Sequence, residues 1–478
     1  MKQPNLKRRD FIKAVGVGAT AVALPGFFNC GKNSRLPNVL FLAVDDLRPQ
    51  INCYGHKQMI SPNIDQLAAR GVLFKRTFCQ VPVCGASRSS LLTGVRPTRN
   101  RFVTFHAWAD KDCPGVPQLP KHFRDNGYYT ISNGKVYHHL EDSAGGWSEP
   151  AWHPDGEWRD YVRPENIEIA RQSEAYAGPA FEAADEPDNA YFDGKIADKA
   201  IADLNRLQQM NQPFFLAAGF KKPHLPFNAP QKYWDWYPRE SINLADNPFR
   251  PKGAPDVALH NWGELRAYFG IPKQGPLPDE MARTLIHGYY ACVSYTDAQI
   301  GRVINELERL GLRENTIIVL WGDHGWQLGE HGLWCKHCNF ETSLHSPLIV
   351  SAPGLKENIQ TSALTEFVDI YPSLCELAGL PLPHHLEGTS FVPLMKNPDR
   401  PWKTAALSRY RDGDSIRTDR HRYTEYTNDQ GEVIGRMLYD HQVDSMENVN
   451  IADLPENQEL VGNLSKMLRE GYQAVLPH

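Results

Sequence analysis

Residues 38–46 have the sequence Asn-Val-Leu-Phe-Leu-Ala-Val-Asp-Asp, a nearly continuous apolar run that ends in two carboxylates. A strand that is buried on both faces of a parallel sheet has this pattern. The run therefore predicts a central strand of such a sheet. Because ligands of parallel sheets bind beyond the carboxyl ends of the strands, Asp45 and Asp46 stand where a binding site is expected.

Three further apolar runs follow along the chain, at residues 213–220, 316–321 and 347–352. Helical patterns lie between the runs, notably over residues 61–70 and 282–310. Strands that alternate with helices predict an α/β fold, with a large domain whose mostly parallel central sheet is flanked by helices.

The chain from about Lys396 onwards has a different pattern. Short alternating runs, such as residues 415–426, precede a helical pattern near residues 460–476. These features predict a small C-terminal α+β domain with a short antiparallel sheet. We therefore expect the large domain to cover residues 36–395 and the C-terminal subdomain to cover residues 396–478.

The N-terminus has the features of an export signal over residues 1–30. Arg8 and Arg9 precede an apolar run from Ala14 to Phe28, which resembles a twin-arginine signal and implies the twin-arginine export machinery as a partner. The run is shorter than the ~20 residues that span a membrane. We expect the protein in the periplasm or at the cell surface. Cys30 is a candidate for lipid anchoring, although a lipoprotein signal normally has a small residue before its cysteine.

The overall charge excludes one class of function. The chain has 51 Lys and Arg against 56 Asp and Glu, a net charge of −5. It therefore lacks the basic surface by which proteins bind nucleic acid.

Apart from Cys30 and Cys84, the chain has seven cysteines, an odd number that cannot all pair internally. We expect structural free cysteines.

A second strand end carries further polar groups. The apolar run at residues 316–321 is followed by Gly322-Asp323-His324-Gly325, in which the glycines let the backbone approach closely. An Asp-Asp pair alone fits a helix cap or a solvated turn as well as a metal site. In a parallel sheet, however, both strand ends face one crevice. Their oxygen ligands and single imidazole favour Ca²⁺ or Mg²⁺ over Zn²⁺.

Residues 83–94 have the sequence Val-Cys-Gly-Ala-Ser-Arg-Ser-Ser-Leu-Leu-Thr-Gly and offer two nucleophiles, Cys84 and Ser87. Ser87 lacks the second glycine of a serine-hydrolase elbow. Cys84 would need a partner histidine, which sequence cannot assign. A Cys-x-x-Cys pair at Cys335 and Cys338 is typical of zinc or redox sites, but no second such pair is present. These residues alone leave the chemistry open.

The segment Cys84-Gly85-Ala86-Ser87-Arg88, with Leu92-Thr93-Gly94 after it, resembles the signature of the sulfatase family, in the alkaline phosphatase-like superfamily. Further segments that match the family in order are Val44-Asp45-Asp46, Gly134-Lys135-Val136-Tyr137-His138, Lys222-Pro223-His224-Leu225-Pro226-Phe227, and residues 323–332, 334–336, 369–372 and 438–440. The Lys222–Phe227 segment and the runs at 415–418 and 422–424 make the chain most similar to the iduronate-2-sulfatase branch.

The resemblance implies a cofactor set and a nucleophile. Cys84 would be converted to formylglycine (3-oxoalanine) by a formylglycine-generating maturation enzyme. Ala86 stands where the signature more usually has proline. In the family, an alanine at this position often goes with a maturation enzyme that does not require oxygen. One Ca²⁺ ion would lower the pKa of the nucleophile and polarise the sulfate. Its implied ligands are Asp45, Asp46, Cys84, Asp323 and His324.

The resemblance also implies roles for five further side chains. Arg88, Lys135 and Lys336 would form a cationic clamp on the sulfate. His138 would take a proton from the formylglycine hydrate to release sulfate. His224 would contact the sulfate and protonate the leaving sugar oxygen, a kind of proton transfer that typically contributes ~10²–10⁴-fold.

The implied substrate is a sulfate monoester of a sugar, a glycan-derived compound similar to iduronate 2-sulfate. A phosphate or phosphonate ester hydrolase of the same superfamily is one alternative. A non-catalytic protein that binds sulfated glycans, with Cys84 unmodified, is another. Residues 141–193 and 228–276 lack periodicity, which is typical of functional loops. We expect the sugar contacts there, from Trp152, Trp158, Trp234, Trp236 and Trp262.

Overall fold

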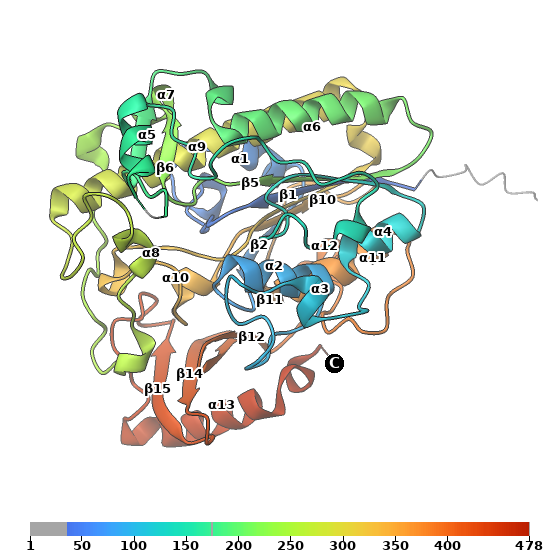
Figure 1. Cartoon of the computed structure of the whole chain (residues 1–478). Helices are drawn as coiled ribbons and strands as arrows, with labels where there is room; N and C mark the ends of the chain where they lie inside the picture. The colour runs from blue at the N-terminus through green and yellow to red at the C-terminus, as the bar shows by residue number, and fades with distance from the viewer. Residues whose placement is uncertain (1–35, 174, 478) are drawn as a thin grey trace, which may run out of the picture. The chain divides into compact units, whose positions relative to one another are not determined.

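In the computed structural model, the described residues are 36–173 and 175–477. The predicted export signal, with Cys30, lies outside them. A seven-stranded sheet with the order β11-β2-β10-β7-β1-β5-β3 forms the centre of this part of the chain (Figure 1). Its strands are β1 (Asn38–Val44), β2 (Val72–Phe78), β3 (Tyr129–Gly134), β5 (Phe214–Phe220), β7 (Thr316–Gly322), β10 (Leu348–Ser351) and β11 (Ile359–Glu366).

The sheet is mostly parallel, as predicted. Strand β1 pairs in parallel with β5 and β7, β3 with β5, and β11 with β2. Only β10 runs antiparallel, to both of its neighbours β2 and β7. Parallel neighbours need a long crossover, usually a helix. Between β7 and β10 the chain forms only short elements: strands β8 (Gln327–Leu328) and β9 (Trp334–Cys335), a 3-10 helix (Glu330–Gly332) and the helix α10 (Glu341–Leu344).

Both faces of the sheet are buried, which explains the continuous apolar pattern of β1. Leu40 and Leu42 belong to one core cluster, and Val39 and Phe41 to the other. Helices α1 (Pro62–Ala69), α6 (Phe192–Gln208) and α9 (Asp279–Arg309) cover the first face. The opposite face is covered by α2 (Cys84–Thr93), α4 (Leu119–Asp125), α11 (Ile370–Ala378) and α12 (Val392–Lys396) (Figure 1).

A second, antiparallel sheet lies near the C-terminus, as predicted. Its strands are β12 (Ala405–Tyr410), β13 (Gly413–Thr418), β14 (His421–Thr427) and β15 (Val433–Asp440). Helix α13 (Gln458–Glu470) packs on β13 and β14 around a small core of its own. The described residues belong to one compact unit, and the boundary between residues 395 and 396 stays a prediction.

The two long segments without periodicity contain short elements. Strand β4 (Phe181–Ala184) of the first pairs in parallel with β6 (Phe227–Pro230). Helix α5 (Pro164–Arg171) lies in the first segment, and α7 (Gln231–Asp235) and α8 (Gly263–Arg266) lie in the second. Another short helix, α3 (Ala109–Asp112), precedes both segments.

No helix in the described ranges is long and apolar enough to cross a membrane. The eight cysteines there are free thiols.

Strand β1 should contribute strongly to stability because its side chains are fully buried. The Leu40→Ala variant is expected to lose about 2–5 kcal/mol of unfolding free energy in a denaturant titration, because it leaves a cavity beneath the sheet. The control Val443→Ala, at a side chain that is 81% exposed, should stay within about 0.5 kcal/mol of the unaltered protein. A Leu40→Ala loss as small as that of the control would contradict this packing.

Candidate active site

Four adjacent parallel strands deliver polar residues to one edge of the sheet. Asp45 and Asp46 follow β1, and Asp323 follows β7. Lys135 follows β3, and His224 lies four residues after the end of β5. The strands β7, β1, β5 and β3 are neighbours in this order, so their carboxyl ends meet. The sequence patterns had placed Asp45, Asp46 and Asp323 at strand ends that face one crevice, whereas Lys135 and His224 were implied by the resemblance alone.

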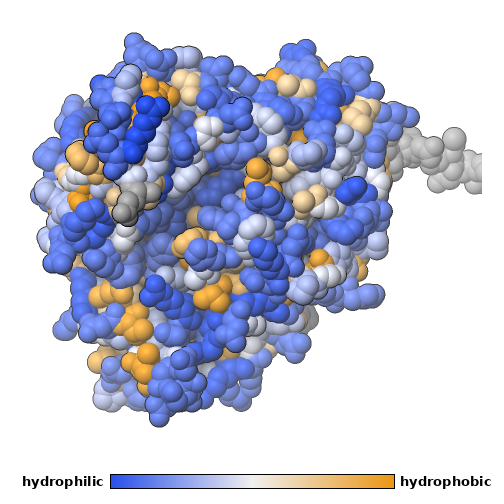
Figure 2. Space-filling model, viewed as in Figure 1, coloured by the Kyte–Doolittle hydropathy of each residue, from blue (hydrophilic) through white to orange (hydrophobic). Residues whose placement is uncertain are grey.

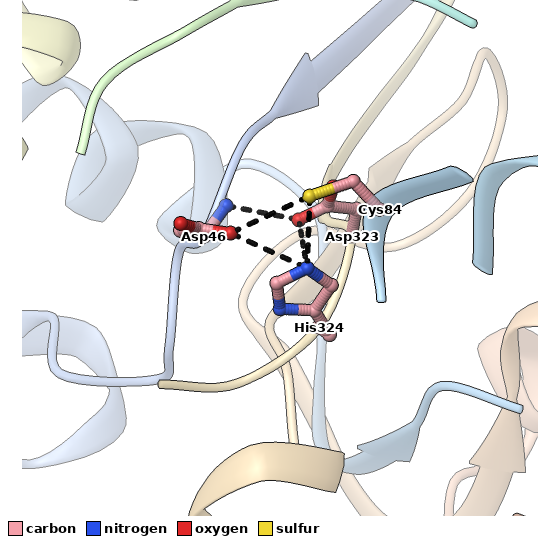
Figure 3. Close-up of side chains that lie close together, drawn as sticks. All are labelled: Asp46, Cys84, Asp323 and His324. Carbon is pink, nitrogen blue, oxygen red and sulfur yellow. Dashed lines mark hydrogen bonds and ion pairs between the residues drawn. The ribbon is translucent and has the colours of Figure 1, made fainter. Parts of the chain in front are cut away.

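Cys84 is the first residue of α2, and its side chain is buried against groups from β1 and β7. Its Sγ lies 3.2 Å from Nε2 of His324 and 3.7 Å from Oδ1 of Asp46 (Figure 3). Burial raises the pKa of the Cys84 thiol well above its usual range. The unmodified thiol is therefore protonated at neutral pH and a poor nucleophile.

Gly85 lets the chain pass close to the start of α2. A Cβ atom at this position would lie 2.5 Å from the backbone oxygen of Phe105. Phe105 lines the cleft beside Cys84, and its ring packs on His138 at a centroid distance of 6.1 Å. The glycine thus keeps the wall next to His138 in place.

Asp46, Cys84, Asp323 and His324 form a buried set whose donor atoms all lie within 4.8 Å of one another (Figure 3). A carboxylate oxygen of Asp323 accepts a 2.9 Å hydrogen bond from the backbone N–H of Asp46. Nδ1 of His324 lies 2.9 Å from the backbone oxygen of Gly325, so Nε2 faces the other three possible metal-ligand atoms of the set. Burial, together with the charge of Asp45, raises the pKa of Asp46 to about 7 despite the opposing effect of Lys336.

Arg88 is fully buried and holds the carboxylates of two strands together. Its Nε donates to Asp323 Oδ2 at 2.9 Å and its Nη2 to Asp45 Oδ1 at 3.2 Å. Its Nη1 donates to the backbone oxygens of Lys135 and Val136. Arg88 does not line the cleft, so the structure brings it to the carboxylates behind Cys84, and its direct role in a sulfate clamp stays a prediction.

Asp45 lies beside the four-residue donor set and forms ion pairs with Arg88 and Lys135. Burial would raise the pKa of its carboxyl, but the positive charges of Lys135 and Arg88 hold it well below its usual range. Burial would likewise lower the pKa of Lys135, yet Asp45 raises it above its usual value. Asp45 is therefore a charged carboxylate at the edge of the donor set.

Lys336 and His224 share a carboxylate that the sequence did not indicate. Nζ of Lys336 lies 3.0 Å from Asp46 Oδ2 and 2.9 Å from Glu264 Oε1. Nε2 of His224 lies 3.1 Å from the same oxygen of Glu264. Glu264 belongs to α8, in a segment without periodicity, and no local pattern distinguishes it.

These residues line a cleft of about 680 Å³. The molecule is hollowed near the centre of the face seen in Figure 2, and the residues around the hollow are mostly hydrophilic. The lining includes Cys84, Lys135, His138, His224 and Lys336 from the predicted set. It also includes residues that were not predicted, among them His153, Arg159, Lys221, Lys222, Glu264 and His337. Lys221 and Lys222 directly follow the apolar run of β5, a signal that could have identified them.

Both histidines that were assigned proton transfers are uncharged in this environment. Burial, with the nearby charge of Lys135, lowers the pKa of His138 to about 2. Burial and the charge of Lys336 also lower the pKa of His224. Nδ1 of His138 is buried and has no hydrogen-bond partner in the described ranges. The His138 imidazole is therefore neutral, but burial and the charge of Lys135 make it a weak proton acceptor until that charge is offset.

The expectation for the tryptophans needs correction. Of the five, only Trp158 lines the cleft. Trp234 and Trp262 are buried in the core, and Trp152 packs against it. Composition marked the loops but could not tell which rings serve packing. Cys335 and Cys338 belong to none of the metal-ligand groups among the described residues.

Comparison with known proteins identifies the protein family to which the chain belongs. The Sulfatase family model matches residues 37–380, and the model described as N-sulphoglucosamine sulphohydrolase, C-terminal, matches residues 329–474. The chain therefore belongs to the sulfatase family, whose members are sulfuric ester hydrolases.

Among named relatives, human iduronate 2-sulfatase is 36% identical over 417 residues, which cover 78% of this chain and 75% of the relative. Two solved structures share the fold at 23% identity and cover 92% of this chain. The structure of BT4656 in complex with its substrate D-glucosamine-2-N,6-O-disulfate has a TM-score of 0.73 over 98% of that chain. Phosphonate monoester hydrolase of Agrobacterium radiobacter has a TM-score of 0.75 over 96%.

The Gly85→Ala variant should lose both stability and activity. Its added methyl group meets the Phe105 backbone, and such overpacking typically costs about 1–3 kcal/mol. We expect a lower unfolding free energy and slower hydrolysis of an aryl sulfate. The control Gly462→Ala lies in α13 with nothing within 4 Å of the added atom, and it should be neutral or up to about 1 kcal/mol more stable. Equal behaviour of the two variants would refute the close approach.

Proposed function

We propose that this protein hydrolyses a sulfate monoester of a glycan-derived sugar, similar to iduronate 2-sulfate, with a formylglycine made from Cys84 and one Ca²⁺ ion. One observation carries the proposal: Cys84 begins α2 and points at Asp46 and His324, at the base of a cleft that Lys135 and Lys336 line. A nucleophile, a set of metal donors and cations for a sulfate thus converge.

The residues present fit Ca²⁺. The donor set contains two carboxylates and one imidazole nitrogen, with Cys84 completing it. Oxygen-rich sets suit hard divalent cations. The pKa of Asp46 near 7 supports the same conclusion, because it reflects buried carboxylates with too little positive charge around them. Asp45 would join as a ligand from the edge of the set, where it shares a second donor group with Cys84 and His224.

Bound Ca²⁺ would act as a Lewis acid, and formylglycine would supply the nucleophilic hydroxyl. The chain itself would hold the substrate. Lys135 and Lys336 are protonated, since Asp45 and Asp46 raise the pKa of their ammonium groups against the effect of burial. They would pair with the sulfate oxygens in a poorly hydrated cleft, where charge pairs are stronger than in water.

Two histidines would transfer the protons of the reaction. Burial and the charge of Lys135 lower the pKa of His138. A sulfate bound to Lys135 would offset that charge, and neutral His138 would then accept a proton more readily. His224 would face the leaving sugar oxygen through Nε2, the atom that contacts Glu264. Lys336 lowers the pKa of His224 and Glu264 raises it. A sulfate bound to Lys336 would reduce the first effect, and His224 would then protonate more readily as a general acid.

The substrate class rests on the relatives and the cleft. The human relative is named iduronate 2-sulfatase, and the structure of BT4656 contains D-glucosamine-2-N,6-O-disulfate. A cleft of about 680 Å³ lies in the size range of small-molecule sites. Trp158 lies at its wall, 5.6 Å from the His224 ring, where an aromatic face can contact a sugar. We therefore propose a sulfated saccharide as the ligand.

Maturation and export complete the proposal. A formylglycine-generating enzyme would convert Cys84, and Ala86 in the signature is consistent with the oxygen-independent kind. The paired arginines Arg8 and Arg9 favour the twin-arginine export machinery, which carries folded proteins. Modification before folding in the cytoplasm would precede such export, since Cys84 is buried in the folded chain.

Mass spectrometry of the Cys84 peptide from the native host should show an aldehyde in place of the thiol. The Cys84→Ala variant should lose at least about a thousandfold in kcat for sulfate esters, as nucleophile removal does in other hydrolases. The control Cys53→Ser changes a free cysteine that does not line the cleft and should retain activity. A retained thiol in an active enzyme would refute the formylglycine mechanism, and faster turnover of aryl phosphate than aryl sulfate would refute the assigned ester.

Removal of Ca²⁺ should lower both activity and stability. A ligand at 100 times its Kd stabilises the folded state by about 2.7 kcal/mol, so Ca²⁺ added after chelation should raise Tm. Asp323→Asn should weaken Ca²⁺ binding in calorimetry, because Asp323 is fully buried in the donor set. Asp419→Asn, at an exposed carboxylate, is the control. Unchanged Ca²⁺ affinity in Asp323→Asn would contradict the proposed site.

A further inference from the structure

The cations of the cleft fall into two groups. Lys135 and Lys336 form ion pairs with carboxylates of the site. Lys221 and Arg159 also line the cleft, but neither forms an ion pair within residues 36–173 and 175–477. Lys222 also lines the cleft, but its ammonium donates to the backbone oxygens of His224 and Pro226 and so stabilises the loop that follows it. Among the described residues, the second group, Lys221 and Arg159, therefore has no carboxylate within ion-pair distance of its cationic groups.

Lys221 is held firmly in place. Its backbone N–H donates to Asp193 Oδ1 at 2.8 Å, and its ammonium lies 4.4 Å from the ring centre of Phe192. The side chain is only 7% exposed. Burying an ammonium without a carboxylate partner is costly. Burial, with the charge of Lys135, accordingly lowers the pKa of Lys221 to about 7.

The buried carboxylates near Lys221 are engaged elsewhere. Asp193 accepts from the backbone N–H groups of Lys221 and Lys222. Asp160 accepts from the backbone N–H of Phe192 at 2.5 Å. Neither carboxylate forms an ion pair with the Lys221 ammonium in the part of the chain that the structure describes. An anion that enters the cleft would be the partner of this ammonium.

Arg159 lies on the aromatic wall of the same cleft. Its guanidinium is 4.0 Å from the ring centre of Trp158 and 5.4 Å from that of Tyr268. Trp158 in turn lies 5.6 Å from His224. Nη1 of Arg159 donates to the backbone oxygen of Ala175, whereas Nε is buried and has no hydrogen-bond partner among the described residues. A stacked guanidinium keeps its planar donors oriented, which suits a carboxylate or a sulfate.

We propose that Lys221 and Arg159 form a second anion site in the cleft, which binds a carboxylate or a second sulfate of the substrate and selects doubly anionic sugars. The inference rests on the proposed function, because the first anion is the sulfate held by Lys135 and Lys336. It adds a specificity determinant that neither the signature segment nor the metal donors contain.

The test compares two substrate pairs that differ in one charge. The first pair is 4-methylumbelliferyl α-L-iduronide 2-sulfate and its methyl ester. The second is D-glucosamine 2-N,6-O-disulfate and N-acetyl-D-glucosamine 6-O-sulfate. We expect kcat/KM at least about tenfold higher for the doubly charged member of one pair, since desolvated charge pairs discriminate strongly. A preference in the first pair identifies a carboxylate, and one in the second identifies a sulfate.

Substitutions then show which residues cause the preference for the doubly charged substrate. Lys221→Met keeps the apolar stem and should remove most of the preference, while kcat/KM for the singly charged member stays within about threefold. Arg159→Gln should reduce the preference in the same direction. Lys195→Met is the matched control, because the Lys195 ammonium also lies near the Phe192 ring, at 5.4 Å, but does not line the cleft. This control should keep the full preference.

Calorimetric Kd values for the same four compounds separate the two proposals. If no compound is hydrolysed but the doubly charged members bind more tightly and Lys221→Met removes that difference, the hydrolytic function is wrong and the second anion site stands. If neither kcat/KM nor Kd depends on the second charge, or if Lys221→Met and Lys195→Met behave alike, the second anion site is refuted even in an active sulfatase.

Discussion

The burial of Arg88 between Asp45 and Asp323 is the constraint on which the site depends. These carboxylates follow different strands, and one guanidinium with no exposed surface joins them through two hydrogen bonds. A buried charge pair is tolerated only when its geometry is good and its remaining donors are satisfied. The backbone oxygens of Lys135 and Val136 accept from Nη1 of Arg88, so four of its five N–H groups are hydrogen-bonded. Arg88 therefore ties the ends of β1, β3 and β7 into one rigid base.

This base explains how the buried Cys84 is held against the proposed metal donors. The signature segment places Cys84 and Arg88 four residues apart on α2, so both project from one side of the helix. Arg88 fixes the carboxylates, and Cys84 is thereby set against Asp46 and His324. The spacing within the signature is thus a geometric requirement: one helical turn separates Cys84, the proposed source of the nucleophile, from the residue that orders its surroundings.

Much of the fold and of the charged base followed from local sequence patterns. The apolar run of β1 predicted burial on both faces, and the residues after β1 and β7 predicted carboxylates at one edge. The direction of β10 was not predicted, because an apolar run has no polarity along the chain. Glu264 was missed since it comes from an irregular segment and meets Lys336 only through tertiary structure. Trp234 and Trp262 show the reverse error, in which aromatic loop residues serve the core.

Charge balance gives a physical reason for a metal ion and for sulfate over phosphate. Four carboxylates and three cations converge on the base of the cleft, which leaves one excess negative charge: Asp45, Asp46, Glu264, Asp323, Arg88, Lys135 and Lys336. A divalent cation would turn this into one positive charge, which a sulfate monoester with its single negative charge would neutralise. A phosphate monoester carries about 1.5 to 2 negative charges at pH 7, and would leave negative charge in a poorly hydrated site. Lys221 and Arg159 are not counted in this balance, so the proposed second anion on the sugar would pair with cations other than those that hold the sulfate.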